Sequence, residues 1–319
     1  MVKAAILDDY QNVAMGFADW SPISKDVDIK VFNQPFAGQD EVIHALKGFE
    51  IIVGMRERTP FPRAVIEALP DLKLLITTGG KNNSFDVKAA NERGITVCGT
   101  GAVGSPTTGV AFGLMLELTR HIGLENVRMK AGAPLQTTIG PDLTGMTLGI
   151  VGLGKLGQRS AAVGNAFGMK PIAWSPNLTP ERAAAGGAGY VSKEDLFAQA
   201  DFITIHIVLS DRTRGLITAA DIGRMKKSAY LINTSRGPIV EEKALIAALQ
   251  SGKIAGAGLD VFDKEPLPLD HPYRTMDNVV ITPHIGYVST QNYGKYFPDI
   301  VEDIRAWLDG KPVRVIEAT

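Results

Sequence analysis

Three side chains that can do acid–base or anion chemistry each follow a short apolar run in the C-terminal half. They are Arg236, Glu265 and His284, after the runs 228–233, 255–261 and 278–282. An arginine can grip a carboxylate with a bidentate fork and polarise the neighbouring carbonyl. A histidine can donate a proton as hydride reaches that carbon, and recover it in the reverse direction. A glutamate on the other ring nitrogen would fix the tautomer and favour the protonated ring. This set suits hydride transfer to a 2-oxo acid.

Each of these residues also has a simpler explanation: a surface arginine, a loop carboxylate and a structural histidine. Their shared placement favours catalysis, because the carboxyl ends of parallel strands meet at one edge of a sheet. In open α/β sheets that edge is where ligands bind. The sequence therefore predicts a catalytic set at Arg236, Glu265 and His284.

A glycine-rich segment upstream predicts a dinucleotide site. The apolar residues 147–151 lead into Gly152-Leu-Gly154-Lys-Leu-Gly157, and a segment suited to a helix follows over 158–167. In this pattern Gly152 permits a sharp turn, Gly154 lets the backbone approach a pyrophosphate, and Gly157 lets the helix pack near the sheet. The N–H groups at the start of the helix then face the phosphates. An ordinary glycine-rich turn is the alternative, and the strand–loop–helix context favours the dinucleotide.

The choice between NAD and NADP stays open. The strand after the glycine loop ends at Ser175, where NAD-binding sheets usually carry an acidic residue for the ribose hydroxyls. Ser175 and Asn177 can hydrogen-bond either a hydroxyl or a phosphate. Arg182 is near, although it also fits the first turn of a helix beginning near Thr179. NADP is permitted and not required.

The elements that must position these residues alternate between short apolar strands and helices, which predicts two α/β units with doubly wound parallel sheets. We expect strands at 3–7, 27–32, 50–53, 73–77, 95–97, 147–151, 170–174, 201–206, 228–233, 255–261 and 278–282. We expect helices at 40–46, 61–69, 85–92, 158–167, 192–199, 219–225, 241–251 and 290–308. Residues 1–100 plus 287–319 would form a substrate domain and 101–286 a dinucleotide-binding domain, with a cleft between them.

Three further elements are expected outside this alternation. The breaker-rich stretch 99–106 suits a linker, and a long helix is expected from Thr107 to about Arg128. Loop-rich residues 131–145 lead into the glycine-loop strand, and Val313–Ile316 is expected to form one short extra strand.

Composition narrows the class of protein. The chain has 319 residues, a formal net charge of −1 and one cysteine, Cys98. Near-neutral charge gives no electrostatic footprint for nucleic acid or an anionic membrane, and no apolar run is long enough to span a bilayer. With Asp8 and Asp9 near the N-terminus a signal peptide is not expected, so we expect a cytoplasmic protein. We expect no metal site, because His44, His121 and His271 lack ligand spacing and His206 suits a hydrogen-bonded core position.

Four motifs together resemble the D-isomer-specific 2-hydroxyacid dehydrogenases. The motifs are Gly152-Leu-Gly-Lys-Leu-Gly157, Asn233-Thr-Ser-Arg-Gly237, Leu259-Asp-Val-Phe-Asp-Lys-Glu-Pro266 and Thr282-Pro-His-Ile-Gly286. The resemblance covers nearly the whole chain. It implies a flavodoxin-like substrate domain, a Rossmann domain for NAD or NADP, and interconversion of a 2-oxo acid with a D-2-hydroxy acid. It also implies a homodimer, with the long helix from Thr107 at the interface.

The resemblance also implies roles for single residues. Asp260 would hold the nicotinamide carboxamide, Thr234 would lie against the nicotinamide ribose, and Arg236, Glu265 and His284 would act as argued above. The expected cofactor contacts are Gly152, Gly154, Lys155, Leu156, Gly157, Ser175, Asn177, Thr107, Thr234 and Asp260. The expected substrate loops contain Met55, Arg56, Gly79 and Gly80, whose backbone N–H groups would help to bind the carboxylate.

Three departures from the family pattern bear on these expectations. Ser175 replaces the usual acid, Leu135 stands where many relatives have tryptophan, and Gly79-Gly80-Lys81 is an unusual substrate loop.

Two rival functions share the scaffold. Formate or phosphite oxidation is one, although the formate enzymes have a glutamine where Thr282-Pro283 stands here. The other is a nucleotide-sensing module resembling the C-terminal-binding-protein corepressors.

Overall fold

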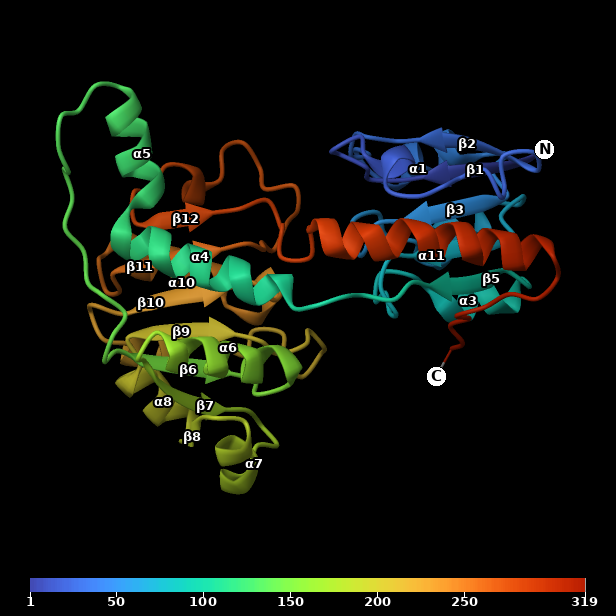
Figure 1. Cartoon of the computed structure of the whole chain (residues 1–319). Coiled ribbons are helices and arrows are strands. Elements are labelled where there is room, and N and C mark those ends of the chain that lie inside the picture. The colour runs from blue at the N-terminus through green and yellow to red at the C-terminus, as the bar shows by residue number, and fades with distance from the viewer. Residues whose placement is uncertain (319) are drawn as a thin grey trace. The chain divides into compact units, whose positions relative to one another are not determined.

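The computed structural model describes residues 1–318, which divide into two compact units (Figure 1). Unit 1 contains Met1–Gly104 and the segment from Val288 onward, and unit 2 is Ser105–Tyr287. Each unit has its own parallel sheet with helices packed against it, which confirms the predicted α/β fold class. No helix within residues 1–318 is both long and apolar enough to cross a membrane.

The sheet of unit 1 has five strands in the order β2-β1-β3-β4-β5, and every pairing is parallel. The strands are β1 (Val2–Ile6), β2 (Val27–Val31), β3 (Ile51–Gly54), β4 (Leu74–Thr77) and β5 (Thr96–Gly99). Strands β3 and β4 are buried along their whole length, as expected for parallel strands covered on both faces. The strand order reverses between β1 and β3. The carboxyl ends there are the position at which such sheets bind ligands.

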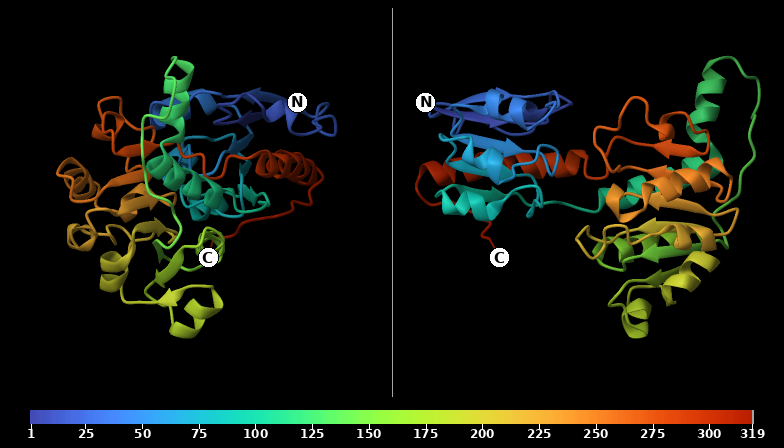
Figure 2. Two further views of the ribbon diagram at one scale, coloured as in Figure 1. Left: turned by 60° about the vertical axis from the view of Figure 1, so that its left-hand side comes forward. Right: turned by 180° about the vertical axis from the view of Figure 1, so that it is seen from behind.

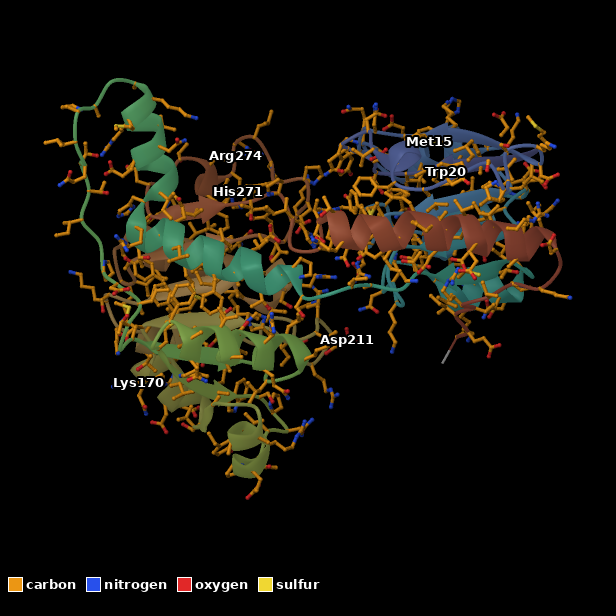
Figure 3. All side chains as sticks on the ribbon, in the orientation of Figure 1. Met15, Trp20, Lys170, Asp211, His271 and Arg274 are labelled. Carbon is orange, nitrogen blue, oxygen red and sulfur yellow. The ribbon has the colours of Figure 1, made fainter. Side chains whose placement is uncertain are left out.

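Helices cover the sheet of unit 1. They are α1 (Gln39–Leu46), α2 (Arg63–Glu67), α3 (Val87–Glu92) and α11 (Thr290–Leu308), with a 3₁₀ turn at Ala14–Gly16. In the core that includes α1, α2 and α3, the rings of Phe61 and Phe85 meet edge to face. The long helix α11 buries Phe297 against Trp20, which is labelled in Figure 3.

The sheet of unit 2 has seven strands in the order β12-β11-β10-β9-β6-β7-β8, again all parallel. The strands are β6 (Thr147–Val151), β7 (Lys170–Trp174), β8 (Gly189–Tyr190), β9 (Phe202–Ile205), β10 (Tyr230–Asn233), β11 (Gly256–Leu259) and β12 (Val279–Ile281). Two features follow from this order. The glycine loop leaves β6 beside the reversal between β6 and β9, and the three strands that precede Arg236, Asp260 and His284 are neighbours.

Helices lie on both faces of this sheet (Figures 1 and 2). They are α4 (Pro106–Arg120), α5 (Ile122–Lys130), α6 (Lys155–Ala166), α7 (Pro180–Ala185), α8 (Lys193–Gln199), α9 (Ala219–Arg224) and α10 (Glu242–Gln250), with 3₁₀ turns at Gly237–Ile239 and Pro272–Arg274. Helices α4 and α6 pack side by side in one core, and α8, α9 and α10 contribute to the second. Helix α5 buries none of its residues.

Two predicted elements are wrong, one helix begins earlier than expected, and one short strand was not predicted. The single helix expected from Thr107 to Arg128 is broken at His121, whose φ of 50° lies in the left-handed region and ends α4. The strand expected at Val313–Ile316 is reduced to one antiparallel bridge between Val315 and Cys98, because only a short stretch runs beside β5. Helix α6 begins at Lys155, three residues earlier than expected, and the two-residue strand β8 was not predicted.

Candidate active site

The glycine loop has the backbone geometry that a dinucleotide requires. Gly152 has a φ of 95°, and a Cβ there would lie 2.9 Å from the His206 carbonyl oxygen. A Cβ on Gly157 would overlap the Gly152 carbonyl, so the first turn of α6 can pack this closely against the loop only if residue 157 is glycine. Gly154 is exposed, with open space where its Cβ would stand. The N–H groups of Lys155 and Leu156 follow in the first turn, where α-helical N–H groups lack partners within the helix.

The end of β7 is tied directly to this loop. The Gly152 N–H donates to the Trp174 carbonyl at 2.9 Å, which places Ser175 beside the glycines. Arg182 lies in the first turn of α7 and its Nη1 donates to the Asn177 carbonyl at 2.9 Å. Residues 175–179 contain no acidic side chain. The loop therefore offers hydroxyl, amide and guanidinium donors and no carboxylate that would repel a 2′-phosphate.

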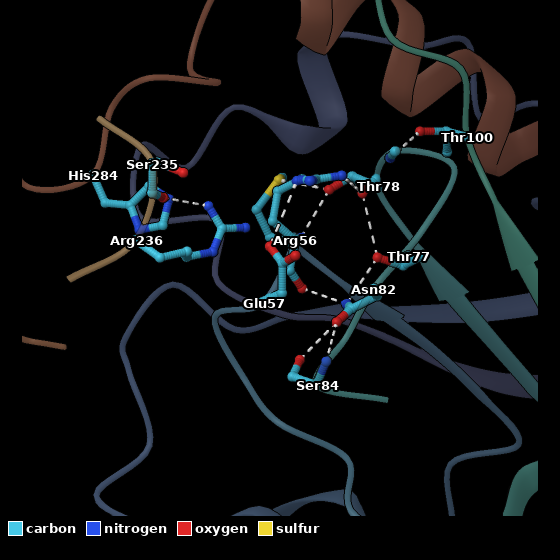
Figure 4. Close-up of polar contacts among 12 residues, drawn as sticks. Arg56, Glu57, Thr77, Thr78, Asn82, Ser84, Thr100, Ser235, Arg236 and His284 are labelled. Atoms are coloured by element: carbon cyan, nitrogen blue, oxygen red, sulfur yellow. Dashed lines mark hydrogen bonds and ion pairs between the residues drawn. The ribbon is translucent and has the colours of Figure 1, made fainter. Parts of the chain in front are cut away.

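Arg236 is held by the turn that ends β10. The Asn233 side chain bonds both ends of this turn: Nδ2 donates to the Arg236 carbonyl at 2.9 Å, and Oδ1 accepts from the Ser235 N–H at 3.0 Å. The Arg236 Nη1 donates to the Ser235 carbonyl at 2.7 Å (Figure 4). Within residues 1–318 the buried Thr234 hydroxyl oxygen has no hydrogen-bond partner. A buried hydroxyl without a partner is unfavourable, so it fits a position that a bound ribose or carboxamide completes.

The turn carrying Arg236 rests on the loop carrying Glu265. A Cβ on Gly237 would lie 2.5 Å from the Asp263 nitrogen and closer still to the Phe262 carbonyl group. The two backbones are therefore in close contact at Gly237, with no room between them for a side chain. A water-sized cavity of about 10 Å³ lies beside this contact, lined in part by Gly237, Phe262 and Asp263.

Glu265 and His284 form a hydrogen-bonded pair. The Glu265 Oε2 lies 2.7 Å from the His284 Nδ1, and the Glu265 Oε1 accepts from the Phe262 N–H at 3.0 Å. Their side chains are only 24% and 14% exposed, so water screens the pair weakly. With Nδ1 donating to the carboxylate, proton exchange with a substrate would go through Nε2.

Asp260 holds the turn on which His284 stands. His284 has a φ of 53°, a strained value for a residue with a side chain. The Asp260 carboxylate is completely buried and accepts from the Thr282 hydroxyl at 2.6 Å and from the N–H groups of Ile285 and Gly286 at 2.8 Å each. Burial raises the pKa of Asp260, and these donors oppose the rise.

Two roles expected for this region need amendment. Thr107, expected as a cofactor contact, uses its hydroxyl to donate to the Gly286 carbonyl at 2.8 Å, so it also fixes the His284 turn. Of the roughly four positions at which the Asp260 carboxylate can accept a hydrogen bond, three are occupied by donors of the His284 turn. About one position is left for a carboxamide N–H. The role of Thr282 was missed by sequence reasoning, although a polar residue directly after the apolar strand Val279–Ile281 was the available signal.

In unit 1 two of the backbone groups expected to bind substrate are already engaged. The Arg56 N–H donates to the Thr78 hydroxyl at 2.9 Å, and the Gly79 N–H donates to the Thr100 hydroxyl at 2.8 Å (Figure 4). Met55 is buried and accepts a hydrogen bond from the Thr78 hydroxyl at its sulfur. Of this expected set, Gly80 is the exposed backbone position, and open space surrounds it.

Two of the other histidines, His206 and His271, have structural partners. The His206 Nε2 lies 3.0 Å from the hydroxyls of Ser160 and Thr204, and burial lowers the pKa of His206 to about 4. His271, labelled in Figure 3, accepts from the Tyr273 N–H at Nδ1 and pairs with Glu242 through Nε2. Within residues 1–318 no three His, Cys, Asp or Glu side chains are grouped as metal ligands.

Known proteins resemble this chain over its whole length. The family model for the D-isomer specific 2-hydroxyacid dehydrogenase NAD-binding domain matches residues 112–286. A hydroxypyruvate reductase of Blautia hydrogenotrophica is 31% identical, with 99% of each chain covered. A D-3-phosphoglycerate dehydrogenase of Synechocystis is 37% identical over 86% of this chain, which spans only 50% of that relative.

A solved structure agrees with the sequence relatives. The putative D-3-phosphoglycerate dehydrogenase of Ralstonia solanacearum superposes with a TM-score of 0.90 and 35% identity, covering 99% of this chain and 96% of that one. The family match spans more than half of the residues, and the hydroxypyruvate reductase match spans nearly all of them. The chain therefore belongs to the D-isomer-specific 2-hydroxyacid dehydrogenases.

Proposed function

We propose that Arg236, Glu265 and His284 carry the interconversion of a 2-oxo acid and a D-2-hydroxy acid that defines the family. The 2.7 Å contact between Glu265 and His284 is the observation that carries this assignment. It orients the ring and keeps Nδ1 as a donor to the carboxylate, which leaves Nε2 for the substrate. Arg236 would bind the substrate carboxylate with two N–H groups and polarise the adjacent carbonyl.

In reduction of the 2-oxo acid, the cofactor, His284 and Glu265 would each have a separate part. The nicotinamide, when bound, supplies the hydride to the carbonyl carbon. His284 would protonate the carbonyl oxygen through Nε2, giving the hydroxyl, and Glu265 would keep Nδ1 as a donor throughout. In the reverse direction His284 accepts the hydroxyl proton.

For cofactor binding, we propose that the glycine loop and the N–H groups of Lys155 and Leu156 hold the pyrophosphate. Thr234 would bond the nicotinamide ribose with its unpartnered hydroxyl, and Asp260 would accept from the carboxamide. Ser175 and Asn177 would bond the adenine ribose, with either a hydroxyl or a phosphate at its 2′ position. In unit 1, the Gly80 N–H would help to bind the substrate carboxylate.

A direct assay tests the proposal. Purified protein is mixed with NADH or NADPH and with glyoxylate, hydroxypyruvate, pyruvate or phenylpyruvate, and nicotinamide absorbance is followed. The names of the relatives make glyoxylate and hydroxypyruvate the first substrates to try. If no oxo acid is reduced with either nucleotide, the proposed function is wrong.

Two variants separate the roles. His284→Ala should lower kcat by about 100-fold or more, the usual contribution of a positioned general acid, while NAD(P)H affinity stays within about threefold. Equal loss of nucleotide binding would contradict the proton-donor role. Arg236→Lys should mainly lower kcat/KM for the oxo acid, because a lysine cannot make the bidentate contact. An unchanged kcat/KM would remove Arg236 from the proposal.

We also propose a cytoplasmic homodimer whose interface includes α5 and the segment that returns from it. Helix α4 buries its apolar face in the core of unit 2, so the interface expected along the long helix from Thr107 shifts to α5. Exposed apolar side chains gather there: Val127 is 63% exposed, Met129 65% and Ile139 97%. The double variant Val127→Lys/Met129→Lys should elute as a monomer in size exclusion with light scattering. Met15→Lys, at an exposed methionine of unit 1, is the control. A monomeric wild type would refute the dimer.

A further inference from the structure

The loop that carries Glu265 has no regular structure of its own. It covers residues 262–268, between β11 and the 3₁₀ turn Pro272–Arg274. Glu265 stands in its middle, where Oε1 accepts from the Phe262 N–H and Oε2 lies against the His284 ring. Because no helix or sheet bonds fix the backbone here, contacts from other segments must set where Glu265 stands.

Arg274 ties the end of the loop that follows Glu265. Its Nε donates to the Pro268 carbonyl and its Nη2 donates to the Leu267 carbonyl, both at 2.8 Å. The Pro268 carbonyl also accepts from the His271 N–H at 3.2 Å. Hydrogen bonds from a charged donor are stronger than neutral ones, and a rigid guanidinium that makes two of them fixes direction as well as distance. The backbone two residues after Glu265 is therefore held in place.

Tyr273 supports the other end of the loop. Its side chain is buried, and its ring centre lies 6.4 Å from that of Phe262, within the range of aromatic contacts. Tyr273 is fixed in turn by His271, whose Nδ1 accepts from the Tyr273 N–H at 3.3 Å. The His271 Nε2 lies 3.3 Å from the Glu242 Oε1, which links the turn to the start of α10. The residue that bonds Glu265 thus rests on an anchored ring.

Both supports belong to one short turn. His271 precedes the turn Pro272–Arg274 and Arg274 ends it, and both residues are labelled in Figure 3. Arg274 is exposed, and exposed arginines gain little stability from their surface bonds. Two of its donors nevertheless go to main-chain carbonyls of the same loop. These bonds bury little surface, so their main effect is on the conformation of the loop.

We propose that Arg274 and Tyr273 are positioning residues for Glu265. They hold the loop on both sides of Glu265, and Glu265 then keeps the His284 ring in the orientation that presents Nε2. The inference rests on the proposed function, which gives Glu265 and His284 their part in proton transfer. It adds a supporting turn, Pro272–Arg274, that acts on the reaction only through the Glu265 loop.

Arg274→Gln is the first test, because an exposed side chain can be replaced with little effect on folding. A misplacement of about 1 Å can lower a rate by roughly 100-fold, and a loop released at one of two supports should lose less, so kcat should fall by about tenfold. KM for the oxo acid and the Kd of NAD(P)H should stay within about threefold, because Arg236 and the glycine loop lie on other segments.

A double-mutant cycle tests whether Arg274 acts through Glu265. Glu265→Ala removes the group that the turn positions, so adding Arg274→Gln to it should change kcat by no more than about twofold. If the two losses multiply, Arg274 acts elsewhere and the inference is overturned. If Glu265→Ala by itself keeps the wild-type kcat, the proposed function of Glu265 is wrong, and the inference falls with it.

Arg224→Gln is the matched control. Arg224 is also exposed, and its Nη1 donates to the Ala220 carbonyl within its own helix, α9. Its kcat should stay within about twofold of the wild type. An equal fall in Arg224→Gln, or an unchanged kcat in Arg274→Gln, would overturn the inference.

Tyr273→Leu tests the second support and separates positioning from stability. It should lower both kcat and Tm, whereas Tyr273→Phe keeps the ring and should retain both. Tyr230→Leu is the control, because Tyr230 begins β10 and its ring stacks on Phe202 with centres 5.0 Å apart. Its Tm should fall while kcat holds. Equal falls of kcat in the two leucine variants would show general loosening and would remove Tyr273 from the inference. Should Tyr273→Leu not fold, the Arg274 cycle still decides.

Discussion

The contact at Gly237 between the two loops that we propose to be catalytic can be tested with one added methyl group. In Gly237→Ala the new Cβ would lie 2.5 Å from the Asp263 nitrogen, and the nearby Phe262 carbonyl is closer. Carbon atoms normally stay about 3.5 Å or more from such neighbours, so one loop must move by about 1 Å. One loop carries Arg236 and the other holds Glu265 against His284. A misplacement of about 1 Å can lower a rate by roughly 100-fold.

We therefore expect Gly237→Ala to lower kcat/KM for the oxo acid by about 100-fold. Overpacking should also lower the free energy of unfolding by about 1–3 kcal/mol, seen as a fall of several degrees in Tm. The assay measures kcat, KM, Tm and the Kd of NAD(P)H by fluorescence. The Kd should change little, because the glycine loop follows a different strand, β6.

Gly223→Ala is the matched control. Gly223 lies within α9, is exposed, and has no atom within 4 Å of the position its Cβ would take. Alanine in a helix is more favourable than glycine by up to about 1 kcal/mol, so Tm should hold or rise and kinetics should stay unchanged. If Gly237→Ala keeps kcat/KM within about threefold of the wild type at an unchanged Tm, the loops do not depend on this contact, and the reasoning fails.

Three further predictions concern carboxyl groups. Glu265→Gln removes the charge beside His284 and should lower kcat by about tenfold or more at neutral pH; an unaltered pH–rate profile would contradict the pairing. Asp260→Asn replaces an acceptor of three hydrogen bonds with a group that also donates, so kcat and Tm should both fall. If both stayed at the wild-type values, the His284 turn would not depend on these hydrogen bonds. Burial raises the pKa of Asp303 to about 7, so the folded chain binds this proton more tightly than the unfolded chain. That contribution to stability is full below about pH 4 and is lost as the pH rises through about 7. Tm measured from pH 5 to pH 8.5 should fall less in Asp303→Asn than in the wild type, and equal slopes would reject the assignment.

The sequence predicts most strands and the outline of the site for a clear physical reason. Buried parallel strands are short continuous apolar runs, and polar residues directly after them mark the ligand edge. The break at His121 was not predictable in this way, because a histidine in the left-handed conformation lacks the glycine signal that usually ends a helix. The use of the Gly79 N–H by Thr100 was also hidden, since the two residues are 21 positions apart. Such contacts depend on the register of neighbouring strands.

Two of the strained turns, one in each unit, show how the fold fixes side chains that the sequence predicts to be functional. Arg56 and His284 both have φ near 50°, and each follows a parallel strand. Each is held from the adjacent strand: Thr78 after β4 bonds the Arg56 backbone, and Asp260 after β11 bonds the His284 turn. The conformation itself costs about 1–2 kcal/mol per residue, which two or three such bonds can offset. The holding residues touch no reacting atom in the bonds they make here. Variants of Thr78 and Asp260 should therefore lower turnover by displacing Arg56 and His284. If either turn kept its conformation in such a variant, the hydrogen bonds would not be what holds the strained residue.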